Sequence, residues 1–311
     1  MTRLLITGAS GLLGLNLALQ ASDSFQVFGA VYYHSLIKVP FQVMQADLKD
    51  EGELVASIEA AKPDVIINCA ALASLEACEN DPQSAQLLNT VLPERLAAIS
   101  KAHSTKLVHI STDAIFDGAK GNYVEEDQPN PLSVYAKTKW EGEKAVTRTN
   151  PQALIARVNF YGFSLLGNRS LAEFFLYNLA AGTQVFGFKD VFFCPLLVQD
   201  LGAILLEMVK KDLKGVYHVV SSQSLSKYEF GVRIARLFGL NENLVEPVSV
   251  SQGKLTAPRS PNLTLCIGKL KRDLNQPIPD QKAGLQKFYE LYKNGYPERL
   301  KSFLPRQGRD D

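Results

Sequence analysis

Tyr135 and Lys139 are the residues whose types and spacing most directly suggest chemistry in this chain. On a helix, residues four apart project from one face, so the phenol and the ammonium would lie side by side. A free tyrosine has a pKa of about 10, and a nearby cation favours the phenolate and lowers that pKa. Ser111 and Thr112 end an apolar run, where a hydroxyl could hold a substrate oxygen while Tyr135 donates. The pattern predicts proton transfer at a carbonyl or alcohol oxygen.

A glycine-rich segment near the start of the chain supplies the second signal. Gly8, Gly11 and Gly14 lie where a short apolar run at 4–6 gives way to a segment with helical periodicity at 11–20. Such glycines allow a tight turn and a close approach of the backbone to a pyrophosphate at the N-terminus of the helix. The spacing is not the Gly-x-Gly-x-x-Gly fingerprint, so a structural turn is the alternative. The strand–turn–helix context favours a dinucleotide site, and hence hydride transfer beside Tyr135.

The residues after the second expected strand bear on the choice of dinucleotide. Many NAD sites place a carboxylate there to bind the ribose 2′-hydroxyl. This chain instead reads Tyr32, Tyr33, His34 and Ser35, with no carboxylate to repel a 2′-phosphate. NADP(H) is therefore favoured, with His34 and Ser35 as neighbours of the phosphate, and NAD(H) is the alternative.

These residues need a scaffold, and the first 160 residues alternate apolar strand-like runs with helical segments. We expect strands at 4–6, 26–33, 42–45, 65–67, 107–110 and 154–158, with helices at 11–20, 53–61, 82–103 and 135–149. Pro93 should kink or divide the third helix. The alternation predicts an α/β fold with a doubly wound parallel (Rossmann) sheet.

The second half of the chain is less regular. Helices are expected at 170–181, 200–211, 227–238 and 281–293, and Pro247, Pro258, Pro261, Pro277 and Pro279 should mark loops. We assign 1–162 to an NADP-binding Rossmann domain. Residues 163–311 are assigned mainly to a smaller α/β substrate-binding lobe on the C-terminal side, and segments near 185–220 could rejoin the sheet.

The composition of the chain bears on whether it binds nucleic acid, a membrane or a metal. The 311 residues include 33 basic and 32 acidic side chains, and a net charge of +1 gives no support for binding nucleic acid or an anionic membrane. No apolar run reaches the roughly 18 residues that a membrane helix requires. The four cysteines and four histidines have no metal-ligand spacing, and the cysteines are expected to be reduced. We expect a soluble cytoplasmic protein without a metal that acts on a small molecule, with a homodimer as the assembly to test.

Seven segments also resemble a known family. They read as motifs of the extended short-chain dehydrogenases/reductases, and more narrowly of the dTDP-4-dehydrorhamnose reductase family, over residues 3 to about 270. The matching segments are 6–14, 63–71, 78–82, 111–118, 131–139, 195–201 and 257–263. The resemblance implies an NADPH-dependent reduction of a nucleotide-linked 4-keto-6-deoxy sugar, a step of cell-envelope polysaccharide synthesis.

The resemblance also implies roles for individual residues. Tyr135 would protonate the developing alkoxide, Lys139 would tune Tyr135 and hold the nicotinamide ribose, and Thr112 would bind the substrate oxygen. The implied cofactor-binding residues are Gly8, Ser10, Gly11, Leu12, Leu13, Gly14, His34, Ser35, Asp47, Leu48, Cys69, Ala70, Ala71, Asn89, Ser111, Tyr135 and Lys139. The implied substrate-binding residues are Thr112, Asp113, Ala114, Phe160 and Arg259.

Two departures from the family pattern leave alternatives open. Ala114 stands where the family often has a tyrosine that lines the sugar pocket, and Phe160 stands for a common tryptophan, so a different sugar could fit. Dehydratases of the superfamily place a glutamate at the position of Ala114, which disfavours dehydration. A nucleotide-sugar 4-epimerase, a reductase of an unrelated carbonyl, and a non-catalytic subunit like the regulatory beta subunit of methionine adenosyltransferase remain as alternatives.

Overall fold

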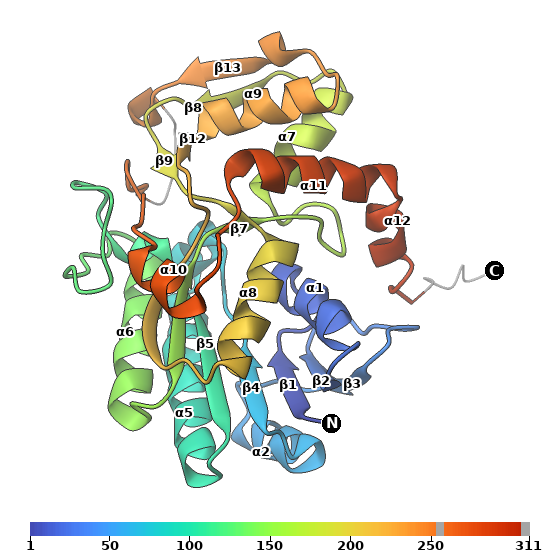
Figure 1. The fold of residues 1–311 in the computed structure, drawn as a ribbon, viewed down its shortest axis with the longest axis vertical. Helices are drawn as coiled ribbons and strands as arrows, with labels where there is room; N and C mark the ends of the chain where they lie inside the picture. Colours follow the sequence, from blue (N-terminus) through green and yellow to red (C-terminus); the bar gives the residue numbers. More distant parts are fainter. Residues whose placement is uncertain (253–257, 306–311) are drawn as a thin grey trace.

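A seven-stranded parallel sheet forms the centre of the computed structural model, which describes residues 1–252 and 258–305 (Figure 1). The strand order is β11-β6-β5-β4-β1-β2-β3, and every neighbouring pair is parallel. The predicted doubly wound sheet is thereby confirmed. The strands are β1 (Arg3–Thr7), β2 (Gln26–Val31), β3 (Gln42–Gln45), β4 (Val65–Asn68), β5 (Lys106–Thr112), β6 (Leu154–Val158) and β11 (Gly215–Val219).

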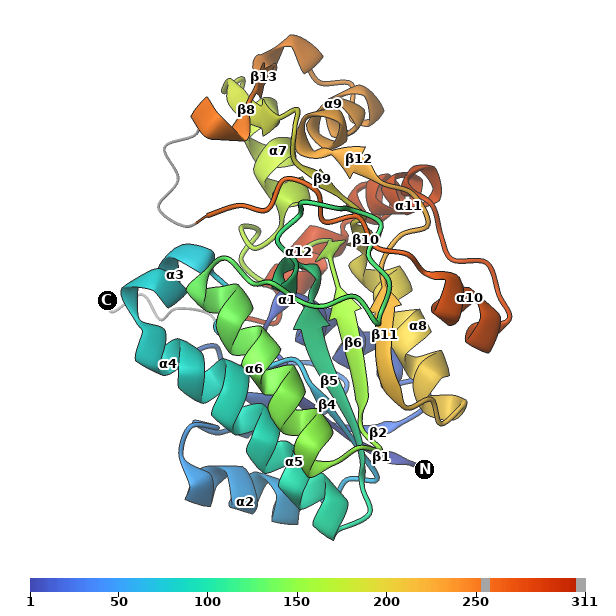
Figure 2. The same cartoon turned by 90° about the vertical axis from the view of Figure 1, so that its left-hand side faces the viewer.

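Helices cover both faces of this sheet, as buried parallel strands require. One face carries α2 (Glu51–Ala61), α5 (Leu92–Ala102) and α6 (Val134–Thr149), whose inner side chains form one buried cluster (Figure 2). The other face carries α1 (Leu12–Ala21) and α8 (Val198–Lys210). The alternation of strands and helices in the sequence thus becomes a three-layer lobe, with the carboxyl ends of all seven strands at one edge.

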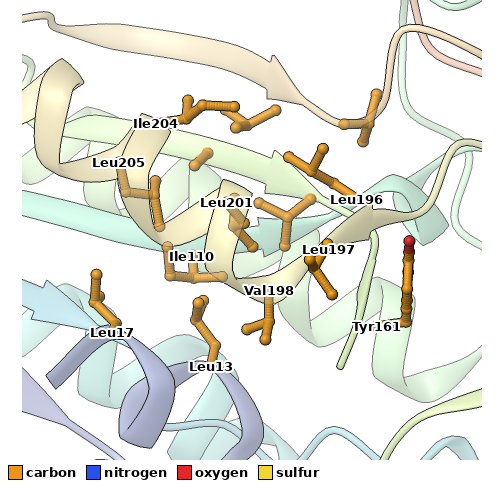
Figure 3. Close-up of a cluster of buried hydrophobic side chains, with 14 of the residues drawn as sticks. Leu13, Leu17, Ile110, Tyr161, Leu196, Leu197, Val198, Leu201, Ile204 and Leu205 are labelled. Atoms are coloured by element: carbon orange, nitrogen blue, oxygen red, sulfur yellow. The ribbon is translucent and has the colours of Figure 1, made fainter. Parts of the chain in front are cut away.

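The packing of α8 on α1 fixes the position of the glycine turn (Gly8, Gly11 and Gly14) that precedes and opens α1. Leu13 of α1 lies opposite Val198 and Leu201 of α8, and Ile110 of β5 belongs to the same cluster (Figure 3). All four side chains are buried. Burying a leucine or valine side chain contributes roughly 1.5–3 kcal/mol, so this cluster holds the first turn of α1 firmly against the sheet.

A smaller α/β lobe sits above the carboxyl edge of the sheet, as predicted (Figure 1). The capping boxes of Ser170 with Glu173 and of Ser226 with Glu229 define where α7 and α9 begin. The elements of the later chain are β7 (Phe160–Tyr161), α7 (Leu171–Ala180), β8 (Val185–Phe188), β9 (Phe192–Phe193), β10 (Leu196–Leu197), β12 (Leu225–Ser226), α9 (Lys227–Leu237), β13 (Val245–Val248), α10 (Gly268–Leu274), α11 (Gln281–Lys293) and α12 (Tyr296–Lys301).

The prediction that Pro247 marks a loop is wrong, because Pro247 lies within β13, opposite Gly187 of β8. A two-stranded sheet has only edge strands, where a proline without an N–H is tolerated. Of the later segments, β11 lies in the central sheet beside β6, whereas β8 pairs with β13 in the smaller lobe. Ala257, which the resemblance included, lies outside the described residues.

The helical segment 82–103 is divided just before Pro93. It consists of α4 (Pro82–Gln86), a π-helical turn (Leu87–Val91) and α5, and it follows the short helix α3 (Leu75–Asn80). Pro93 cannot donate to the carbonyl of Asn89, four residues earlier. That carbonyl instead lies against Gly142 of α6, where an added Cβ would come within 2.1 Å of the oxygen. The division lets α6 pack closely on this turn.

In the part of the chain that the structure describes, no helix combines the length and apolarity that crossing a membrane demands.

Candidate active site

A cavity of about 820 Å³ lies between the carboxyl edge of the sheet and the smaller lobe. It brings together nearly all of the residues singled out from the sequence. The predicted residues on its wall are Gly8, Ser10, Gly11, Leu12, Leu13, Gly14, His34, Asp47, Leu48, Cys69, Ala70, Ala71, Ser111, Thr112, Asp113, Ala114, Tyr135, Lys139, Phe160 and Arg259. Ser35 and Asn89 are not on this wall.

The glycine turn has the geometry of an anion cradle. Gly8 has a φ of +65°, which favours glycine, and an added Cβ would touch the backbone of Ala70 at 3.0 Å. At Gly14, an added Cβ would lie 2.2 Å from the carbonyl oxygen of Gly8. Helix α1 begins after Gly11 with no capping side chain and no acidic residue in its first turn. Its unpaired N–H groups and its positive dipole end are therefore available to a pyrophosphate.

The far end of the cavity, beyond β2, carries a group that the sequence analysis missed. Lys49 lines the wall with His34, and its ammonium lies 5.4 Å from the ring centre of Tyr32 and 3.5 Å from Asp47. Ser35 is exposed outside the wall. The basic side chains at this end are thus His34 and Lys49. The signal for Lys49 was its place two residues after Asp47.

Helix α6 presents the tyrosine and the lysine to the cavity. The Ser133 hydroxyl accepts a hydrogen bond from the Ala136 N–H at 3.2 Å, so the helix begins at Val134 and Tyr135 lies in its first turn. Lys139 follows one turn later and is only 2% exposed. Its ammonium donates a hydrogen bond to the Ile110 carbonyl oxygen at 2.6 Å. Burial lowers the pKa of Lys139 to about 8.

The expectation that the pKa of Tyr135 lies below its usual value is wrong for this structure. Burial raises the pKa of Tyr135 to about 12, and the charges of Asp113 and Cys78 act in the same direction. Only an interaction with the Thr112 hydroxyl opposes them. The physical reason is that the loss of water around the phenol outweighs the surrounding interactions. Tyr135 is therefore held as a neutral phenol, the form that can donate a proton.

Thr112 and Asp113 form a buried polar pair at the end of β5. The Thr112 hydroxyl donates to Asp113 Oδ1 at 3.2 Å and accepts from the Ala114 N–H at 3.1 Å. Asn159, which follows β6, donates to Asp113 Oδ2 at 2.6 Å. Burial raises the pKa of Asp113 to about 6 despite these hydrogen bonds. Thr112 thus caps the turn after β5 while also facing the cavity.

Two other predicted cofactor residues act mainly within the protein. The Ser111 hydroxyl donates to the carboxylate of Glu143, so its proton is committed to α6. Asn89 is fully buried and holds the loop after β4 through hydrogen bonds with the Leu72 N–H at 3.0 Å and the Leu72 carbonyl at 3.1 Å. Asn89 therefore shapes the wall beside Ala71 without lying on it.

The side of the cavity toward the smaller lobe carries the substrate candidates. Phe160 and Ala114 lie on the wall, and Arg259 lies there too, in an ion pair with Glu76. Lys227, the first residue of α9, also lines the cavity. No described carboxylate or other hydrogen-bond acceptor lies within bonding reach of its ammonium, whose charge is opposed by burial and by Arg259. The sequence did not reveal Lys227, because only the fold of the smaller lobe brings the first residue of α9 to the cavity.

Within residues 1–252 and 258–305, no three His, Cys, Asp or Glu side chains gather as a metal site. The four cysteines are free thiols. Burial raises the pKa of Cys69, beside Lys139, to about 12, which makes this thiol a poor nucleophile.

A parallel doubly wound sheet with a glycine turn and a Tyr–Lys pair at its carboxyl edge defines an extended short-chain dehydrogenase/reductase. The chain belongs to the RmlD substrate binding domain family, whose model matches residues 1–294.

The similar proteins include enzymes and a subunit of another kind. A probable low-salt glycan biosynthesis reductase, Agl14 of Haloferax volcanii, is 29% identical over 93% of this chain and 99% of its own length. The dTDP-4-dehydrorhamnose reductase of Aggregatibacter actinomycetemcomitans is 30% identical over 91% of this chain and 97% of its own length. Methionine adenosyltransferase 2 subunit beta of Xenopus tropicalis is 33% identical over 87% of this chain and 82% of its own length. A solved structure of a hypothetical dTDP-4-dehydrorhamnose reductase from Sulfolobus tokodaii is 31% identical and has a TM-score of 0.78, with 87% of this chain and 94% of that chain covered.

Proposed function

We propose that this protein is an NADPH-dependent reductase of a nucleotide-linked 4-keto-6-deoxy sugar. The observation that carries the proposal is the convergence of Tyr135, Lys139 and Thr112 on one cavity with the glycine turn of α1. The turn fits a dinucleotide, because a Cβ at Gly14 would fill the cradle and the first N–H groups of α1 have no partner. Bound NADPH would supply a hydride to the keto carbon.

The residues of the chain would then handle the oxygen and its proton. The Thr112 hydroxyl would hold the keto oxygen, and Tyr135 would donate its proton to that oxygen as negative charge develops there. Burial keeps Tyr135 protonated until that moment. Lys139 would hold the nicotinamide ribose and, as a cation, stabilise the tyrosinate left after the transfer.

The substrate side of the cavity supports a nucleotide-linked sugar. A nucleotide sugar carries a diphosphate next to the sugar ring, and Lys227 and Arg259 put two cations on the wall near Asp113. Ala114 and Phe160 leave room for the ring itself. One relative is named for a substrate of this class, dTDP-4-dehydrorhamnose, and another is named a probable reductase of glycan biosynthesis.

The cofactor and assembly complete the proposal. NADPH is favoured over NADH, because His34 and Lys49 line the end of the cavity beyond β2, where they would lie beside the ribose 2′-phosphate, and no carboxylate directly follows β2. We further propose a homodimer in the cytoplasm without a nucleic-acid partner, in line with the net charge of +1. Light scattering of the purified protein would test the dimer.

A second candidate rests on a specific observation. The similarity to methionine adenosyltransferase 2 subunit beta is as strong as that to the reductases. On this alternative, the protein would bind a dinucleotide and a partner enzyme without turnover. Absorbance at the NADPH band, followed with dTDP-4-keto-6-deoxy sugars, separates the two, because only the reductase consumes NADPH with the sugar. A 4-epimerase would interconvert sugars without net consumption.

A further inference from the structure

We propose that Glu143 is a positioning residue of the active site, which holds Lys139 in its charged form and fixes the strand end that carries Thr112. Neither the sequence motifs nor the comparisons assign a role to Glu143. The inference rests on the proposed role of Lys139, and its first test below needs no substrate.

Glu143 lies one helical turn beyond Lys139 and two turns beyond Tyr135. Residues spaced by four project from one helix face, so the three side chains form a row along α6. Glu143 is 2% exposed, as is Lys139. A carboxylate at this depth is costly without partners, so its retention there requires an explanation from its contacts.

Those contacts join α6 to two strands of the sheet. Arg157 of β6 binds both oxygens of Glu143, with its Nη2 at 2.9 Å from Oε2 and its Nε at 3.2 Å from Oε1. The Ser111 hydroxyl of β5 donates to the same carboxylate. Ser111 and Arg157 are direct neighbours in the parallel register of β5 and β6. One carboxylate thus ties the helix of Tyr135 to the residue immediately before Thr112.

The groups around Lys139 differ in how they affect the charge of its ammonium. Cys69, from the loop after β4, and His109, on β5, lie near its ammonium, and burial keeps both of them neutral at pH 7. Arg157, on β6, is paired with Glu143. Burial opposes the charge of Lys139, whereas Glu143 is the first among the groups that favour that charge.

Asp113 is a further charged group of this neighbourhood, and it acts on Tyr135 and Lys227. Glu143 is therefore the carboxylate that compensates the buried ammonium. Without it, the neutral amine becomes the favoured form at a lower pH, and the cation proposed to stabilise the Tyr135 phenolate is lost.

The test is a titration of Lys139 in the full-length protein, followed by the ¹³Cε signal of labelled lysine and assigned with Lys139→Met. We expect a midpoint near pH 8 in the wild type, and in Glu143→Gln a midpoint lower by roughly half a unit or more. The matched control is Glu141→Gln, which removes the same charge from the same helix at a residue without a hydrogen bond or ion pair among the described residues. Its midpoint should equal that of the wild type.

A second variant covers the case in which Glu143→Gln does not fold because Arg157 is left unpaired. The double variant Glu143→Gln, Arg157→Gln is compared with Arg157→Gln alone, so that the two proteins differ only in the charge of Glu143, and the midpoint of the double variant should be the lower. If the midpoint is unchanged by the loss of Glu143 in whichever of these pairs folds, Glu143 is a structural partner of Arg157 and the proposal is overturned.

The pH profile of turnover separates this inference from the proposed function. In the reductase assay, the alkaline limb of kcat/KM should move to lower pH in Glu143→Gln and stay in place in the control Glu141→Gln. A shifted titration midpoint in a protein without turnover would reject the reductase and keep the inference. If the enzyme is active but neither the Lys139 midpoint nor the alkaline limb of kcat/KM shifts in Glu143→Gln, the inference about Glu143 is rejected and the reductase function is kept.

Discussion

The Lys139 ammonium is hydrogen-bonded to the carbonyl oxygen of Ile110 at 2.6 Å, which joins α6 to β5 at the floor of the cavity. This contact fixes the ammonium between the sheet and the proposed nicotinamide site. It also explains why Lys139 remains a cation in a buried position, because a charged donor to a carbonyl forms a strong hydrogen bond. The charge is nevertheless sensitive to pH, since burial lowers the pKa of Lys139 to about 8.

The first prediction concerns this sensitivity. Turnover should fall as the pH rises through about 8, because the neutral amine no longer stabilises the charge that develops on Tyr135. In Lys139→Met, turnover should be lower by roughly two orders of magnitude or more at every pH. Steady-state rates of NADPH oxidation from pH 6 to 10 provide the measurement. Lys137→Met, on the exposed side of the same helix, is the control and should keep the wild-type profile.

The second prediction concerns the cradle at the start of α1. In Gly14→Ala, the new Cβ would lie 2.2 Å from the Gly8 carbonyl, so α1 must move away from the turn. We expect NADPH to bind more weakly by roughly tenfold or more, since a misplaced helix N-terminus loses its contacts with the pyrophosphate. Calorimetric titration gives the dissociation constant. Gly268→Ala, where an added Cβ meets nothing within 4 Å, should bind as the wild type does; equal affinities for both variants would remove the turn from the cofactor site.

The third prediction concerns the stability of the fold. Burial raises the pKa of Asp113 to about 6 from 3.8, so the folded protein binds more protons than the unfolded chain between these values. The contribution of Asp113 to stability is therefore present at low pH and is lost as the pH rises through about 6. The shift of about two units corresponds to roughly 3 kcal/mol in the free energy of unfolding.

Urea unfolding of Asp113→Asn measures this effect. The free energy of unfolding of the variant, relative to the wild type, should increase from pH 4 to pH 7. Asp23→Asn, at an exposed position after α1, should show a difference that does not vary with pH. A constant difference for Asp113→Asn as well would mean that the carboxyl is not held protonated by its burial.

The fourth prediction concerns the substrate end of the cavity. Lys227→Met should raise the KM for the nucleotide sugar by roughly tenfold or more and leave the KM for NADPH nearly unchanged, because a charge-assisted contact to a phosphate is lost. Lys214→Met removes a charge from an exposed site beside β11 and serves as the control. An increase confined to the KM for NADPH would place Lys227 at the cofactor and contradict the assignment.

Local patterns predicted the parts of this protein that depend on nearby residues. The glycine turn, the Tyr135–Lys139 pair and the polar end of β5 each follow from spacing within a few residues, and parallel strands bring their carboxyl ends to one edge. The helix break before Pro93 follows from the chemistry of proline in the same way.

The features that the sequence did not reveal depend on tertiary contacts. Lys227 reaches the cavity only because the smaller lobe brings the start of α9 to it, and Asn159 donates a hydrogen bond to Asp113, which lies 46 residues earlier in the chain. The direction of the pKa shift of Tyr135 was predicted wrongly because desolvation is a property of the whole fold. The strand that contains Pro247 could not be predicted from local sequence, because it forms by pairing with β8, which is distant in the chain.

The most direct test of the central claim compares the wild type with Tyr135→Phe in NADPH oxidation driven by a dTDP-4-keto-6-deoxy sugar. Loss of the phenolic proton donor should lower turnover by roughly two to four orders of magnitude while NADPH binding is kept. Tyr123→Phe, whose hydroxyl binds Asp117 away from the cavity, controls for the loss of a tyrosine hydroxyl and should retain full activity. The account predicts sugar-dependent oxidation that requires Tyr135; near-equal turnover in wild type and Tyr135→Phe, or no oxidation with any such sugar, would contradict it.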